Sequence, residues 1–101
     1  MVLHGIDIPT ERIAEFCRQN HIRRLALFGS VLRDDFGPES DIDVLVEFEP
    51  GQRVGLFRLT AVELELSELL GRKVDLNTAG FLSPSFRDEV QREAQTLYVA
   101  A

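Results

Sequence analysis

Two aspartates separated by one residue, Asp41 and Asp43, open a stretch in which apolar and polar residues alternate. Because side chains on a strand alternate between its faces, a strand here would place both carboxylates on the same side of a sheet. Two carboxylates held close together repel each other unless a cation lies between them, they share a proton or water surrounds them. Hard divalent cations such as Mg²⁺ prefer these oxygen ligands. The pair alone does not identify a metal site, because many acidic pairs at strand ends are only solvated.

A third carboxylate, Asp75, lies between Val74 and Leu76 in a second short apolar stretch. On a strand it would face away from these two apolar neighbours. If this strand lies beside the strand that carries Asp41 and Asp43, the three carboxylates converge on one face of the sheet.

Gly29 and Ser30 follow a short apolar run, residues 24–28, that is typical of a buried strand. A glycine here lets a ligand approach the backbone, and the serine hydroxyl and amide can donate hydrogen bonds to phosphate oxygens. The alternative is an ordinary strand-to-helix turn with Ser30 as the N-cap. Arg33 could bind phosphate oxygens in bidentate fashion or could be a solvated surface arginine.

The segments Leu27–Ser30 and Asp41–Val46, ten residues apart with Arg33 and Ser40 between them, resemble the minimal nucleotidyltransferases of the DNA polymerase β superfamily. Gly71–Leu76 also resembles the segment in which that family carries its third metal-binding carboxylate. The resemblance therefore covers nearly the whole chain. It implies an α/β (α+β) fold, with a small mixed β-sheet flanked by helices as in the palm of polymerase β.

The resemblance also implies a site that binds Mg²⁺ together with a nucleoside triphosphate, for which ATP is the family's example. Metal ions in such a site can activate the attacking hydroxyl and neutralise the departing pyrophosphate. One of the three carboxylates, Asp75, would be either the general base or an additional metal ligand. The resemblance assigns catalysis and metal binding to Asp41, Asp43 and Asp75, and phosphate binding to Gly29, Ser30 and Arg33.

Proteins of this kind are commonly the antitoxin of a toxin–antitoxin pair whose partner is a small helical RNase of the HEPN class. The resemblance then implies a protein adenylyltransferase that transfers AMP from ATP to a tyrosine of the toxin and so silences it. Two alternatives stay open, a noncatalytic antitoxin that acts by contact alone and nucleotidyl transfer to a small molecule. The sequence does not fix the acceptor, the nucleobase or the oligomeric state.

The length and the charge of the chain limit the kinds of protein that it can be. A chain of 101 residues is expected to form one domain, residues 1–101, with a modest core. Its formal net charge is −6 and its 11 lysines and arginines are scattered, so direct nucleic-acid binding is not expected. An acidic protein does suit a basic, RNA-cleaving partner. The sequence has no apolar run of bilayer-spanning length and no signal-peptide pattern at its start, so we expect a cytoplasmic protein.

Apolar periodicity predicts the elements that must position the site. Helices are expected at about residues 10–19, 54–70 and 83–94, with a short helical segment at 31–35. Strands are expected at residues 24–28, 41–48, 73–77 and 96–100. Gly71 stands where a glycine typically ends a helix. The apolar surface of the long helix could also serve partner docking or a homo-oligomer.

The remaining reactive or aromatic residues are predicted to be structural. Cys17 falls at helical apolar spacing, which indicates a buried thiol. His4 and His21 have no second ligand at metal-binding spacing. The aromatic side chains could stack on bases, but so small a core needs them for packing; these are Phe57, Phe81, Phe86 and Tyr98.

Overall fold

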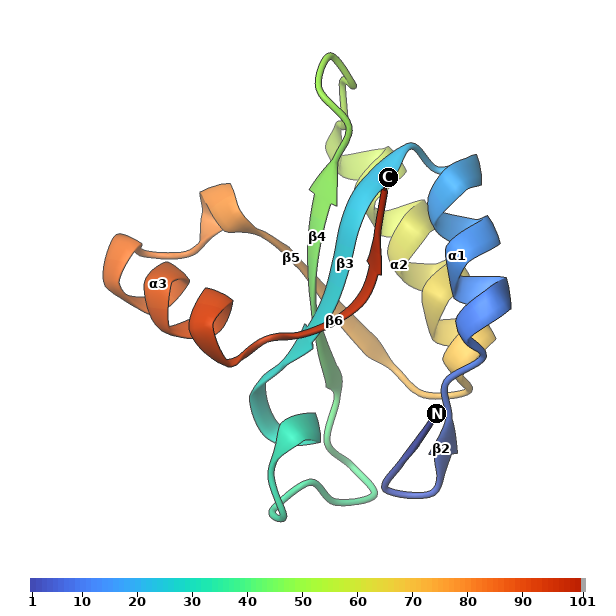
Figure 1. Ribbon diagram of the computed structural model, residues 1–101, viewed down its shortest axis with the longest axis vertical. Helices are drawn as coiled ribbons and strands as arrows, with labels where there is room; N and C mark the ends of the chain where they lie inside the picture. The colour runs from blue at the N-terminus through green and yellow to red at the C-terminus, as the bar shows by residue number, and fades with distance from the viewer. Residues whose placement is uncertain (101) are drawn as a thin grey trace.

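The computed structural model describes residues 1–100, except for the side chain of Phe81, and contains a four-stranded mixed sheet with helices on both faces (Figure 1). The strand order is β5-β4-β3-β6. β3 is antiparallel to both of its neighbours, whereas β4 and β5 are parallel. The mixed sheet that the sequence predicts is therefore confirmed. The strands are β3 (Ile22–Phe28), β4 (Ile42–Phe48), β5 (Val74–Thr78) and β6 (Gln95–Val99).

Two helices, α1 (Thr10–Gln19) and α2 (Leu56–Leu70), cover one face of the sheet, and α3 (Pro84–Glu93) packs on the other. The alternation along the central strand β3 explains this layering. Leu25 and Leu27 join the larger core under α1 and α2, whereas Ala26 and Phe28 pack with Val90 of α3. Burying each large apolar side chain contributes about 1.5–3 kcal/mol, so both cores hold the sheet in place.

α2 connects β4 to β5 and also holds β5 at the edge of the sheet. The backbone N–H of Val74 donates to Ser67 Oγ at 3.0 Å, and that of Leu76 donates to Glu63 Oε2 at 2.8 Å. These bonds satisfy backbone donors that an edge strand otherwise leaves to solvent. Because Val74 and Leu76 belong to the core under α1 and α2, Asp75 between them faces the opposite side of the sheet.

Several predicted boundaries differ from the observed ones. β3 begins at Ile22, two residues early, and α2 begins at Leu56, because Gly55 before it is in an extended conformation. The predicted helical segment at residues 31–35 is wrong in position, since the 3₁₀ turn η1 covers Gly29–Leu32 and Arg33 is already extended. Gly29 has a φ of +75°, which lets the chain turn at once where β3 ends. The predicted helix end at Gly71 is confirmed, with a φ of +69°.

A short hairpin at the start of the chain is absent from the predicted elements. β1 (Val2–Leu3) pairs antiparallel with β2 (Ile6–Asp7). The two residues between them, His4 and Gly5, have φ values of +51° and +77°. Positive φ at both central positions is the geometry of a primed two-residue turn, which matches the twist of the paired strands.

α2 carries apolar side chains on its exposed side as well as on its buried side. Leu56, Phe57 and Leu64 are 79%, 94% and 61% exposed, whereas Val62 and Leu66 are buried. The prediction that Phe57 packs in the core is therefore wrong. Within residues 1–100, no helix has both the length and the apolar character needed to cross a membrane.

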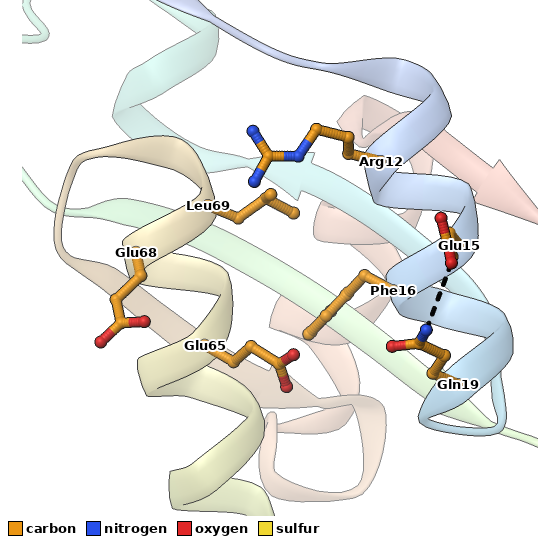
Figure 2. A pocket seen from close by; sticks show the side chains of 7 residues that line it. All are labelled: Arg12, Glu15, Phe16, Gln19, Glu65, Glu68 and Leu69. Carbon is orange, nitrogen blue, oxygen red and sulfur yellow. Dashed lines mark hydrogen bonds between the residues drawn. The ribbon is translucent and has the colours of Figure 1, made fainter.

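A groove of about 340 Å³ lies between α1 and α2. Figure 2 shows Arg12 and Phe16 of α1 extending toward α2, with Leu69 and Glu65 of α2 on the other side. Since α1 and α2 cover the face of the sheet that is opposite Asp75, this groove is separate from the predicted site.

Candidate metal and nucleotide site

Asp43 on β4 and Asp75 on β5 lie side by side, because the parallel strands pair these two residues in register. Their neighbours Val44 and Leu76 belong to the core under α1 and α2, so both carboxylates lie on the face that α3 covers. Asp41 lies one residue before β4 begins. The prediction of adjacent strands is confirmed for Asp43 and Asp75, whereas Asp41, the first residue of the predicted strand, lies one residue outside the observed one.

The surroundings of Asp43 oppose the ionisation of its carboxyl. Burial raises the pKa of the Asp43 carboxyl above its ordinary value, and the negative charges of Asp75 and Asp41 raise it further. The positive charge of the Arg33 guanidinium lowers the pKa of Asp43. The three aspartates therefore share one electrostatic field, although each comes from a different segment of the sheet or the loop before it.

Gly29 lies directly against Asp43. The register between β3 and β4 pairs Phe28 with Asp43, so the turn at Gly29 begins where that carboxylate projects. A methyl group at the α-carbon of Gly29 would overlap the Asp43 carboxylate. The sequence predicts that this glycine permits close approach of a ligand, and the structure adds that it makes room for a carboxylate.

Ser30 and Arg33 are the other two residues predicted to bind phosphate. Ser30 lies inside η1, and Phe28 occupies the N-cap position without a side-chain capping bond, so the alternative role of Ser30 as an N-cap is wrong. The Ser30 carbonyl accepts a hydrogen bond from the backbone N–H of Arg33 at 2.9 Å. The Arg33 side chain is exposed, forms a 3.5 Å ion pair with Asp35 and lines a pocket together with Gly29 and Asp43.

Arg72 holds the loop before Asp41 and was not among the predicted site residues. Its Nη2 donates to the carbonyls of Gly37, Pro38 and Ser40 at 3.0, 3.3 and 2.7 Å. Its guanidinium also lies 4.7 Å from the centre of the Phe36 ring. No local sequence pattern identifies this role, because the loop and Arg72 are more than thirty residues apart. Arg72 is therefore a positioning residue for the loop that leads to Asp41.

Lys73 neutralises part of the carboxylate charge. Its Nζ lies 3.8 Å from Asp41 Oδ2, and both side chains are substantially exposed. The backbone also joins the two segments, since the N–H of Ile42 donates to the Lys73 carbonyl at 2.9 Å. An exposed ion pair contributes at most about 1 kcal/mol, so a stronger cation could displace the ammonium from Asp41.

The carboxylates suit a metal ion that also takes ligands from water and substrate. Within residues 1–100, no three His, Cys, Asp or Glu side chains are grouped closely enough to hold a metal by themselves. Mg²⁺ is usually bound by one or two carboxylates plus water and substrate phosphates. Asp41 and Asp43 supply that number of oxygen ligands, and Asp75 lies one strand away. This donor set therefore fits Mg²⁺ that arrives with a nucleotide.

The contacts of the cysteine and the two histidines agree with the structural roles predicted for them. Cys17 is buried, and burial raises the pKa of its thiol to about 12, so the reactive thiolate is absent at neutral pH. The His4 ring nitrogen Nε2 lies 3.0 Å from the Val31 carbonyl, and its ring lies 4.9 Å from that of Phe36. His21 is paired with Glu49 at 3.2 Å.

Two relatives match most of this chain. A proposed protein adenylyltransferase of Methanocaldococcus jannaschii is 35% identical over 90 residues, which is 89% of this chain and 95% of the relative. The protein adenylyltransferase MntA of Thermococcus cleftensis is 35% identical over 87 residues, which is 86% of both chains.

Solved structures share the fold. A proposed minimal nucleotidyltransferase superposes with a TM-score of 0.70 at 36% identity, over 84% of this chain and 85% of that one. A complex of a tri-AMPylated Shewanella oneidensis HEPN toxin with an MNT antitoxin matches with a TM-score of 0.65, over 90% of this chain and 70% of that one. At 22% identity, this second likeness supports the fold alone.

Replacement of Gly29 by alanine tests the contact with Asp43. Gly29 and Gly5 have φ values of +75° and +77°. Because alanine is strained in this left-handed conformation, alanine at either position should lower the free energy of unfolding by about 1–2 kcal/mol. Only at Gly29 does the new methyl group meet a side chain, whereas Gly5 has open space. We expect Gly29→Ala to lower the free energy of unfolding in urea more than Gly5→Ala does. Asp43→Ala in the same chain should recover part of the difference; equal losses at the two glycines would contradict the contact.

The raised pKa of Asp43 predicts a pH-dependent gain from Asp43→Asn. When the pKa of a carboxyl in the folded protein exceeds its ordinary value of 3.8, the protein loses stability as the pH rises through the interval between the two values. Without Mg²⁺, Asp43→Asn should therefore unfold at higher urea concentration than wild type at pH 7, and the gain should vanish near pH 3. Asp7→Asn, at an exposed position on β2, is the control and should show no such gain. An Asp43→Asn protein that is no more stable than wild type at pH 7 would contradict the raised pKa that burial and the neighbouring carboxylates give Asp43.

The family model of the nucleotidyltransferase domain matches residues 10–97. That span includes the turn at Gly29, the loop held by Arg72 and all three aspartates. With this match and the similarity of the two relatives, the chain belongs to the nucleotidyltransferase domain family.

Proposed function

We propose that this protein is a Mg²⁺-dependent protein adenylyltransferase that transfers AMP from ATP to a tyrosine of a HEPN-type helical toxin in the cytoplasm and so acts as its antitoxin. The observation that carries the proposal is the register of β4 and β5, which sets Asp43 beside Asp75 at the point where β3 turns through Gly29. Such a cluster of carboxylates next to a glycine turn is suited to metal-bound phosphates.

In this mechanism the carboxylates have separate tasks. Asp41 and Asp43 would hold the metal, which supplies Lewis-acid stabilisation of the phosphates when it is bound. Asp75 is exposed and would accept the proton of the attacking tyrosine hydroxyl or complete the metal's ligands. The hydroxyl oxygen forms a bond to the α-phosphorus, the bond from that phosphorus to the bridging oxygen breaks, and pyrophosphate leaves.

The turn after β3 would bind the phosphates. Gly29 brings the backbone close to Asp43, and the Ser30 hydroxyl and amide and the Arg33 guanidinium can each donate to phosphate oxygens. The Arg33 guanidinium stabilises the negative charge on Asp43, so it is close enough to stabilise phosphates that bind beside Asp43. The Arg33 cation, together with these hydrogen-bond donors, would offset part of the negative charge that the carboxylates and the triphosphate bring together.

The relatives support the choice of acceptor class. The Thermococcus cleftensis relative carries the name protein adenylyltransferase, and a HEPN toxin accompanies the MNT antitoxin in the structure with the same fold. The net charge of −6 also favours association with a basic partner. An antitoxin that works by contact alone makes the opposite prediction about the carboxylates, so one experiment separates the two.

The test is transfer of label from α-labelled ATP to a co-expressed HEPN toxin in the presence of Mg²⁺. Asp43→Asn and Asp75→Asn should each reduce the rate at least about 100-fold, as expected for loss of a group that stabilises the transition state. Asp7→Asn should retain the wild-type rate, since Asp7 lies on β2, outside the site. Toxin inhibition that survives Asp43→Asn without any label on the toxin would instead identify a contact antitoxin.

A further inference from the structure

A pocket of about 180 Å³ lies beside the carboxylates, between the sheet and α3. It opens next to Gly29, Arg33 and Asp43, which the proposed function assigns to the phosphates and the metal. Its opposite wall is one face of α3, where the lining residues recur at spacings of three and four. The α3 residues that line it are Phe86, Glu89, Val90 and Glu93, and Phe28 forms its floor on β3.

The size of the pocket limits what it can hold. Pockets that enclose a whole drug-sized ligand are usually about 300–1,000 Å³, so this one would take only part of a nucleoside triphosphate. It would hold one end of the nucleotide while the rest extends past Gly29 toward the carboxylates.

The lining indicates which end that is. The carboxylates of Glu89 and Glu93 would repel phosphate, and the residues assigned to phosphate lie on the opposite wall. The rings of Phe28 and Phe86 with Val90 offer an apolar surface for a flat ring instead. Phe86 is 46% exposed, in contrast to its predicted place in the core, and it lines the pocket, so its side chain is accessible to a ligand.

We propose that this pocket binds the nucleobase of the nucleoside triphosphate, with Phe86 stacked on the base and the carboxylates of Glu89 and Glu93 accepting hydrogen bonds from its exocyclic amine. This inference rests on the proposed function, and it adds the part of the site that selects the base. An ionised carboxylate accepts hydrogen bonds but cannot donate them. The pocket therefore favours adenine over an otherwise identical purine without the amine.

The test measures binding of three ligands with Mg²⁺ and without any acceptor: ATP, purine riboside triphosphate, which lacks only the amine, and inorganic tripolyphosphate. Wild type should bind ATP about tenfold or more tightly than purine riboside triphosphate, as hydrogen bonds to charged groups imply. Glu89→Ala/Glu93→Ala should abolish this ratio. Phe86→Ala should weaken ATP binding by about five- to a hundredfold, the usual range for loss of base stacking, and leave tripolyphosphate binding unchanged. Phe86→Tyr should keep the affinity for ATP.

The outcomes separate this inference from the proposed function. Wild-type binding of ATP that is insensitive to Phe86→Ala and equal to that of purine riboside triphosphate would overturn the base pocket and leave the enzyme standing. If Phe86→Ala slowed transfer to the toxin at unchanged ATP affinity, the pocket would hold the acceptor tyrosine instead, which also overturns the inference. Failure of wild type to bind either ATP or tripolyphosphate with Mg²⁺ would contradict the proposed function itself.

Discussion

The burial of Asp43 beside the like charge of Asp75 is the constraint on which the candidate site depends. The parallel pairing of β4 with β5 fixes the two residues in register, and burial makes the charge on Asp43 more costly. This unfavourable arrangement persists because apolar side chains on both faces of the sheet hold the strands together. A folded protein can keep such a cluster of like charges where a bound cation relieves the repulsion, as strained sites elsewhere serve function.

The elements next to the carboxylates lower the repulsion without removing it. Arg33 stabilises the charge on Asp43, and Lys73 pairs with Asp41 across the start of β4 and β5. Arg72 fixes the loop that leads to Asp41 through three backbone carbonyls. These contacts come from the turn after β3 and from the segment after α2, so the site depends on the packing of the whole sheet and not on one motif. α3 lines the pocket beside Gly29, Arg33 and Asp43 with apolar and acidic residues.

The sequence predicts those features that local periodicity determines. The helices and the four strands of the main sheet follow from spacing, as does the projection of Asp43 and Asp75 away from their apolar neighbours, and Gly71 marks the end of α2. Contacts between distant segments could not be predicted this way. The hold of Arg72 on the loop before Asp41 and the fit of Gly29 against Asp43 depend on register between strands. The prediction that Phe57 and Phe86 pack in the core is wrong for the same reason, because helical spacing alone does not tell which face of α2 or α3 meets the sheet, whereas Tyr98 does pack against the core and the side chain of Phe81 lies outside the described residues.

The central claim is that the aspartates form a site for a divalent cation that arrives with a nucleotide. It is tested most directly by a crystal structure of the protein with Mn²⁺ and a nonhydrolysable ATP analogue, with the metal located by anomalous scattering. The account predicts an anomalous peak at coordination distance from Asp41, Asp43 and the phosphates of the analogue. Phosphates bound elsewhere on the molecule, or no peak beside these carboxylates at saturating Mn²⁺, would contradict it.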